Sequence, residues 1–143
     1  MKHRALGLLA ASLFLAVSPV EATAAGLESA GSFALGGVGV AGTMSAGERA
    51  LRDVLREPDA VRRLEALIPN ATPAGKLYAL LGLRLRDRAA YERALEKCRT
   101  VDAKVETARG CMLDHEPFAD LLKEIERGQY DTFLERKWPD NAR

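Results

Sequence analysis

The sequence predicts a mainly α-helical domain, a short right-handed stack of three helical hairpins behind an extended, glycine-rich N-terminal arm. Three observations predict this fold. Apolar residues recur with helical spacing from residue 45 onward, capping residues open several of these segments, and a weak internal repeat links them. One short β-hairpin is compatible with the arm.

Residues 1–24 are organised like a secretory signal peptide. Lys2 and Arg4 make the start positive, residues 5–17 are apolar and uncharged, and Ala22 and Ala24 supply the small residues of a cleavage site. The apolar run is shorter than the ~20 residues that span a bilayer, so a retained membrane anchor is the weaker alternative. We therefore expect cleavage after Ala24 and export to the periplasm or the medium.

Residues 25–44 form a separate segment, rich in glycine, alanine and serine and almost without charge. Each glycine costs ~1 kcal/mol in a helix interior, so a helix is not expected here. A flexible leader is one interpretation. The favoured one is an extended arm that lies on the domain, with Val38 and Val40 alternating as in a short strand.

Residues 45–143 are expected to form the helical domain. Ser45 and Glu48 make a capping box, Thr72 precedes a proline at the first helical position, and Asp87 caps the next segment. The segment 77–85 is apolar almost all round, which predicts that this helix is the central one.

The internal repeat groups these helices into pairs. Ala50, Ala79 and Ala108 are spaced by 29 residues, each in the first helix of a pair. The predicted hairpins cover residues 45–69, 72–99 and 102–128, and a short closing helix follows.

Residues 104–112 leave a second interpretation open. Val105 and Thr107 alternate as in a strand, Gly110 weakens a helix, and such a strand could lie beside the GVGV of residues 37–40. The repeat favours the helix.

The hairpin pattern resembles HEAT-type helical repeats. The matching residues are Ala79, Gly82, Leu83 and Asp87 in the second hairpin, and Asp102, Val105 and Ala108 in the third. This resemblance implies an architecture and no activity.

Most of the expected mature chain also resembles a group of small exported bacterial proteins, one of which accompanies a microcin gene cluster. The matching blocks are GGVGVAGTMSAGERA, KLYALLGLRLRD, VETARGCM and IERGQYD. The resemblance implies no catalytic residue, but it suggests a toxin-associated or immunity-like accessory protein as one possible function.

Both cysteines of the chain, Cys98 and Cys111, lie thirteen positions apart. In an exported protein an even number of thiols is usually oxidised. A metal site needs three or four ligands, and a redox pair usually has CxxC spacing. We therefore predict a structural Cys98–Cys111 disulfide.

Charge and motifs exclude several functions. Cleavage after Ala24 would leave 19 basic and 19 acidic side chains, so no positive excess favours nucleic acid or anionic lipid. The glycine-rich GGVGVAG lacks the GK[ST] of a P-loop. No cofactor and no metal site are expected.

Asp114, His115 and Glu116 form the best polar cluster. A histidine between carboxylates could act as a general base, which would make the protein a small exported enzyme. The favoured interpretation is a helix start, with Asp114 as the N-cap and Pro117 in the first turn.

The remaining candidate site residues are ones that could bind a partner protein. Arg84 and Arg88 could contact an acidic protein, although a solvated face with neighbouring carboxylates is the favoured interpretation. Phe133 and Trp138 could anchor a partner or seal the end of the helical stack. The sequence thus favours a non-catalytic binding protein whose partner is another envelope or secreted protein.

Overall fold

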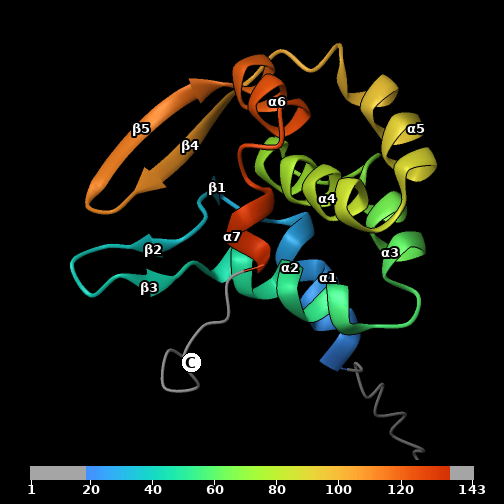
Figure 1. The fold of residues 1–143 in the computed structure, drawn as a ribbon, viewed down its shortest axis with the longest axis horizontal. Helices are drawn as coiled ribbons and strands as arrows, with labels where there is room; N and C mark the ends of the chain where they lie inside the picture. The colour runs from blue at the N-terminus through green and yellow to red at the C-terminus, as the bar shows by residue number, and fades with distance from the viewer. Residues whose placement is uncertain (1–18, 136–143) are drawn as a thin grey trace, which may run out of the picture.

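The computed structural model describes residues 19–135, with side chains from Ala24 onward. The elements in chain order are α1 (Pro19–Glu28), β1 (Ser32–Phe33), β2 (Gly37–Val38), β3 (Thr43–Met44), α2 (Ala46–Arg56), α3 (Ala60–Leu67), α4 (Pro73–Arg86), α5 (Arg88–Cys98), β4 (Lys104–Arg109), β5 (Met112–Pro117), α6 (Phe118–Glu126) and α7 (Asp131–Glu135). Figure 1 shows the helices gathered on one side and two β-hairpins, β2–β3 and β4–β5, projecting from the other.

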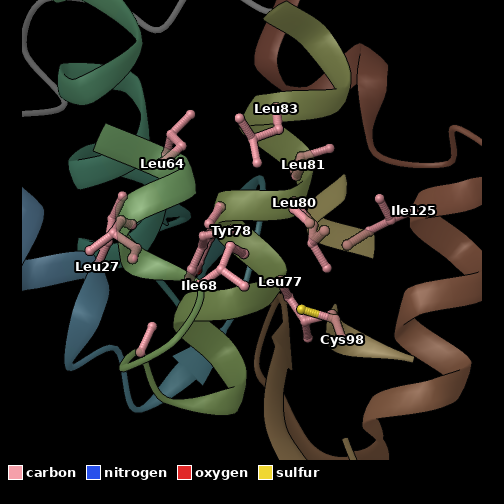
Figure 2. Close-up of a cluster of buried hydrophobic side chains, with 14 of the residues drawn as sticks. Leu27, Leu64, Ile68, Leu77, Tyr78, Leu80, Leu81, Leu83, Cys98 and Ile125 are labelled. Atoms are coloured by element: carbon pink, nitrogen blue, oxygen red, sulfur yellow. The ribbon is translucent and has the colours of Figure 1, made fainter. Parts of the chain in front are cut away.

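The central element is α4, as its all-round apolar sequence predicts. It contacts α1, α2, α3, α5 and α6 as well as β1 and β4. Its residues from Leu77 to Leu83 are all buried, and Figure 2 shows their side chains meeting Leu27, Leu64, Cys98 and Ile125 from the surrounding elements. Burying a large apolar side chain stabilises a fold by ~1.5–3 kcal/mol, so this helix organises the core.

Local capping signals place the first helices of this core. The Ser45 hydroxyl accepts a hydrogen bond from the Glu48 amide at 3.0 Å, Thr72 accepts one from Gly75 at 3.1 Å, and Asp87 accepts one from Ala90 at 2.9 Å. These N-caps confirm the helix starts predicted at 45, 72 and 87.

A mixed sheet of order β1-β4-β5 lies at the edge of the helices. β1 pairs parallel to β4, with Phe33 opposite Thr107, and β4 pairs antiparallel to β5. A single bridge between Val38 and Gly110, with the Gly39 amide donating to the Gly110 carbonyl at 2.8 Å, ties the β2–β3 hairpin to the turn of β4–β5.

The predicted fold class, a mainly α stack of three helical hairpins, is wrong. The pairs α2–α3 and α4–α5 fall within the first two predicted hairpins, but residues 104–117 of the third form the β4–β5 hairpin. The HEAT-like architecture is therefore absent from the described residues, and Ala108, one of the repeat alanines, lies in a strand.

The third predicted hairpin is wrong because buried and exposed side chains alternate along β4, and this alternation outweighs the helical repeat. In β4, Val105 and Thr107 are buried, whereas Lys104 and Glu106 are exposed, which is a period of two. Gly110 has φ +59°, which suits the first central position of a tight hairpin turn. The strand interpretation of residues 104–112, beside residues 37–40, is the one that the structure adopts.

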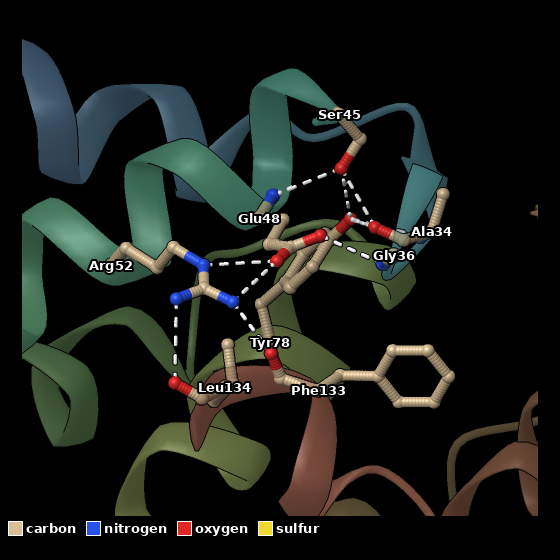
Figure 3. Close-up of polar contacts among 8 residues, drawn as sticks. All are labelled: Ala34, Gly36, Ser45, Glu48, Arg52, Tyr78, Phe133 and Leu134. Carbon is tan, nitrogen blue, oxygen red and sulfur yellow. Dashed lines mark hydrogen bonds and ion pairs between the residues drawn. The ribbon is translucent and has the colours of Figure 1, made fainter. Parts of the chain in front are cut away.

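A buried polar cluster joins the N-terminal arm to three helices (Figure 3). Glu48, fully buried on α2, accepts a hydrogen bond from the Gly36 amide at 2.8 Å and forms an ion pair with Arg52 at 2.8 Å. Arg52 donates in turn to the carbonyl oxygens of Phe133 and Leu134 on α7.

The other half of the cluster holds β1 against α4. The Tyr78 hydroxyl donates to the Ala34 carbonyl at 2.9 Å and accepts from the Ala34 amide at the same distance. Burial raises the pKa of Tyr78, so this hydroxyl keeps its proton at neutral pH. The cluster therefore fixes both the segment after β1 and helix α7 to the helical core.

The predicted signal peptide lies mostly outside the described residues, which begin within it at Pro19. The predicted cleavage point after Ala24 falls inside α1, and Leu27, fully buried, follows it closely. Among the helices of residues 19–135, none has the length and apolarity to cross a membrane.

Candidate functional site

The candidate catalytic residues Asp114, His115 and Glu116 lie in β5, so the helix start predicted at Asp114 is wrong. The helix α6 begins at Phe118, because residues 112–117 pair with β4 instead. Neighbouring residues of a strand point to opposite faces, so His115 lies opposite Glu106 on one face, and Asp114 and Glu116 on the other. The three side chains do not converge.

The described side chains around His115 are not arranged as metal ligands. Within residues 19–135, no three side chains of the histidine, cysteine, aspartate or glutamate type are grouped so that they could hold an ion. His115 is exposed, and its nearest charged partner is Glu106 at 4.0 Å.

The two cysteines are free thiols in this structure, and the predicted disulfide is not formed. Cys98 is buried at the end of α5, whereas Cys111 is exposed in the turn of the β4–β5 hairpin (Figure 1). Figure 1 shows α5 and the turn of the β4–β5 hairpin on opposite sides of the molecule, while a disulfide needs Cα atoms within ~7 Å. A bridge would require the hairpin to move.

This placement predicts unequal thiol reactivity. In the native protein iodoacetamide should modify Cys111 alone, because burial raises the pKa of Cys98 and shields its sulfur. Both thiols should react after unfolding without reductant, as measured by intact mass. Modification that appears only after reduction would instead show that the predicted disulfide forms and that the hairpin adopts another position.

The predicted partner-binding arginines do come together. Arg84 and Arg88 line a polar groove of about 600 Å³ between α4, α5 and α6, together with Arg99. Each arginine is ion-paired: Arg84 with Asp131 at 3.1 Å, Arg88 with Glu92 at 2.8 Å. Because Glu92, Glu96 and Glu126 also line the groove, its charge is balanced, and an acidic partner finds no excess of positive charge there.

Tyr91 forms the floor of this groove. Its hydroxyl is buried and has no well-oriented hydrogen bond within the described residues, while the Arg84 guanidinium lies 6.0 Å from its ring centroid. Burial raises the pKa of Tyr91, so the phenol is neutral at physiological pH. We interpret the groove as a stabilising contact between helices.

Phe133, the predicted anchor on α7, lines a different hollow. Trp138 lies outside the described residues. The hollow is a cavity of about 170 Å³ bounded by β1, β4, α6 and α7. The rings of Phe33 and Tyr130 meet edge to face with centroids 5.2 Å apart, and those of Tyr130 and Phe133 lie 6.4 Å apart. Phe133 therefore forms one wall of an aromatic cavity.

Carboxylates lie beside this cavity. Arg109 on β4 donates to Glu116 at 3.2 Å and to Glu124 on α6 at 3.4 Å, and the Tyr130 hydroxyl donates to the same oxygen of Glu124. Thr107 donates to Glu116 at 2.9 Å. Burial, and then the bond to Glu124, raises the pKa of Tyr130 far above its ordinary range, so its hydroxyl remains a donor.

The most exposed large apolar side chains lie at the hairpin turns. Val40 follows β2 and is 97% exposed, while Met112 and Leu113 at the start of β5 are 75% and 72% exposed. The bridge between Val38 and Gly110 keeps the two turns together. We call Val40, Met112 and Leu113 the tip surface. Because Met112 and Leu113 are neighbours in β5, they point to opposite faces of the hairpin, so the tip surface extends around both faces.

Sequence reasoning missed both the aromatic cavity and the tip surface. The tip could have been found from Gly110, since a glycine between two alternating segments predicts a tight turn, which exposes its flanking residues. The cavity could not, because Phe33, Arg109 and Tyr130 are far apart in the sequence and meet only through the β1–β4 pairing and the position of α7.

No family model, curated protein or solved structure matches this chain. Its class is therefore defined by its own fold: a small mixed α/β domain in which a three-stranded mixed sheet borders a helical core. The resemblance to small exported bacterial proteins stays a prediction.

Proposed function

We propose that this chain is exported and acts as a non-catalytic binding protein, with the tip surface as its contact with another protein of the envelope or medium. The observation that carries the proposal is the exposure of Val40, Met112 and Leu113 on two neighbouring turns. Monomeric proteins seldom leave large apolar side chains grouped in water without a partner.

The shape of the tip surface favours one kind of partner. Both hairpins project away from the helices (Figure 1), so the tip is convex, and it offers few side chains. A stable interface between two copies would need about 20–30 residues on each side, which this tip does not provide. A convex apolar tip instead suits a concave apolar pocket on a different protein, where a few buried anchors supply most of the affinity.

Charge around the tip supports a protein partner over a lipid surface. Asp114 follows Leu113 on β5, and Arg109 lies opposite Met112 on β4, so the charge beside the tip surface is balanced. Anionic membranes attract basic segments, and each such residue contributes ~1 kcal/mol near the surface. The tip surface has no excess of positive charge to attract such a membrane.

The experiment compares a tip variant with a matched control. A photo-crosslinker in place of the exposed Ala41 identifies the bound protein, and the purified partner is then titrated by calorimetry. Replacing Val40, Met112 and Leu113 with serine should weaken its binding at least ~100-fold, because burying each side chain contributes ~1.5–3 kcal/mol.

The control is Leu85→Ser, which changes an exposed leucine, 36% exposed, on α4 away from the hairpins. Unchanged affinity in the control together with loss in the tip variant supports the proposal. Equal affinity of wild type and tip variant, or binding to phosphatidylcholine–phosphatidylglycerol vesicles in place of a protein, would refute it.

A further inference from the structure

The aromatic cavity has the size of a small-molecule site. Its volume is about 170 Å³, and an apolar cavity of roughly 150 Å³ is large enough to hold benzene. It opens between elements that are distant in the chain, β1, β4 and α7, which is where ligand sites commonly form. The cavity adjoins the tip surface, since its lining residues Ala108 and Arg109 pair with Leu113 and Met112, but none of the three tip residues lines it.

The rings of the cavity favour a cation. Three aromatic side chains line one space: Phe33 from β1, Tyr130 from the turn before α7, and Phe133 from α7. The face of an aromatic ring is negative, and it attracts a cation that lies within about 6 Å of its centroid. Aromatic walls also exclude water, which strengthens this attraction.

The ionised groups at the cavity add negative charge. Glu124, 23% exposed, lines the cavity together with Arg109. Glu116, 25% exposed, lies behind this lining and pairs with Arg109, which is the only cation that bridges the two carboxylates in the described residues. One negative charge therefore remains when both carboxylates are ionised. Arg109 is 62% exposed and its bonds to the carboxylates are long, so it neutralises them weakly.

Glu124 has a free acceptor for a ligand. The Tyr130 and Arg109 donors both use its Oε2, which leaves Oε1 without a hydrogen bond in the part of the chain that the structure describes. Tyr130 holds the carboxylate at the edge of the aromatic walls. A cation between the rings would thus meet a carboxylate at one side.

We propose that the cavity between β4 and α7 binds a small organic cation, such as a methylated ammonium group, with its methyl groups against Tyr130 and Phe133 and its charge near Glu124. The observations that carry this are the cavity's volume, its aromatic walls and the net negative charge of the cluster that Glu116 and Glu124 form with Arg109. An inorganic ion would leave the aromatic walls uncovered, and a neutral molecule would leave the charge unpaired.

The test uses tetramethylammonium chloride as the probe, titrated into the full-length protein and followed by amide resonances. Saturable shifts at Thr107, Ala108 and Tyr130 are expected. The neutral tert-butanol, which has a similar shape, should bind at least about tenfold more weakly. Shifts that stay linear with concentration, or equal affinity for the two probes, would overturn the proposal.

Two variants separate charge from shape. Glu124→Gln keeps the size of the side chain and should weaken tetramethylammonium binding by about tenfold or more, whereas Glu96→Gln, an exposed glutamate on α5, should leave it unchanged. If Glu124→Gln fails to fold, Phe133→Leu removes one ring and retains apolar volume. Affinity that survives in the folded variant refutes the site.

Discussion

Replacing Glu48 with alanine is expected to lower the free energy of unfolding by about 3–5 kcal/mol, the usual cost of removing one partner of a buried ion pair. Glu48 is fully buried and pairs with Arg52, which is 15% exposed, so the variant leaves a guanidinium without its carboxylate inside the protein. It also removes the acceptor of the Gly36 amide. Urea denaturation followed by circular dichroism measures the change.

The effect should extend beyond α2. Arg52 holds the carbonyl oxygens of Phe133 and Leu134, so loss of Glu48 should also loosen α7 and increase hydrogen exchange at its amides. The matched control is Glu92→Ala, because the Arg88–Glu92 pair has the same i, i+4 spacing but is exposed, 77% and 59% for the two side chains. This control should cost less than ~1 kcal/mol. Equal losses in the two variants would show that the buried cluster does not hold the arm and α7.

Replacing Gly75 with alanine is expected to destabilise the protein by about 3 kcal/mol, near the upper end for overpacking a core. A Cβ atom on Gly75 would lie 2.2 Å from the carbonyl oxygen of Leu27. That oxygen belongs to the backbone of α1 and cannot rotate away as a side chain does. Either α1 or the first turn of α4 must shift, and thermal denaturation should record a lower Tm.

Gly31→Ala supplies the comparison, since a Cβ there would meet no atom within 4 Å and the backbone has no positive φ. We expect it to leave stability unchanged or raise it by up to ~1 kcal/mol, because alanine restricts the unfolded chain. If Gly75→Ala proves as stable as Gly31→Ala, the close packing of α1 on α4 is wrong. That result would also remove the support for Leu27 as part of the core.

Particular residues show where sequence reasoning succeeded. Ser45, Thr72 and Asp87 cap their helices as predicted, because a cap is a contact between a side chain and an amide three residues away. The burial of residues 77–83 also followed from composition, since a helix without a polar face has no side to turn toward water.

Other residues show where it failed. Ala108 matched a helical repeat, and Asp114 matched an N-cap, yet both lie in the β4–β5 hairpin. A short segment carries too little local preference to choose between helix and strand, and β4 gains a second partner in β1, which is about seventy residues away. The pairing of β1 with β4 contributes no stability until the chain has folded around α4.

The amino-acid sequence by itself determined the helix starts, the central helix and the near-zero net charge, because these depend on contacts between near neighbours or on composition alone. Only the tertiary structure decided that residues 104–117 form strands, that Cys98 and Cys111 are apart, and that Phe133 borders an aromatic cavity. Each of these depends on segments far apart in the chain meeting in space. The pairing of β1 with β4 and the packing of α7 on Arg52 create contacts that no local pattern encodes.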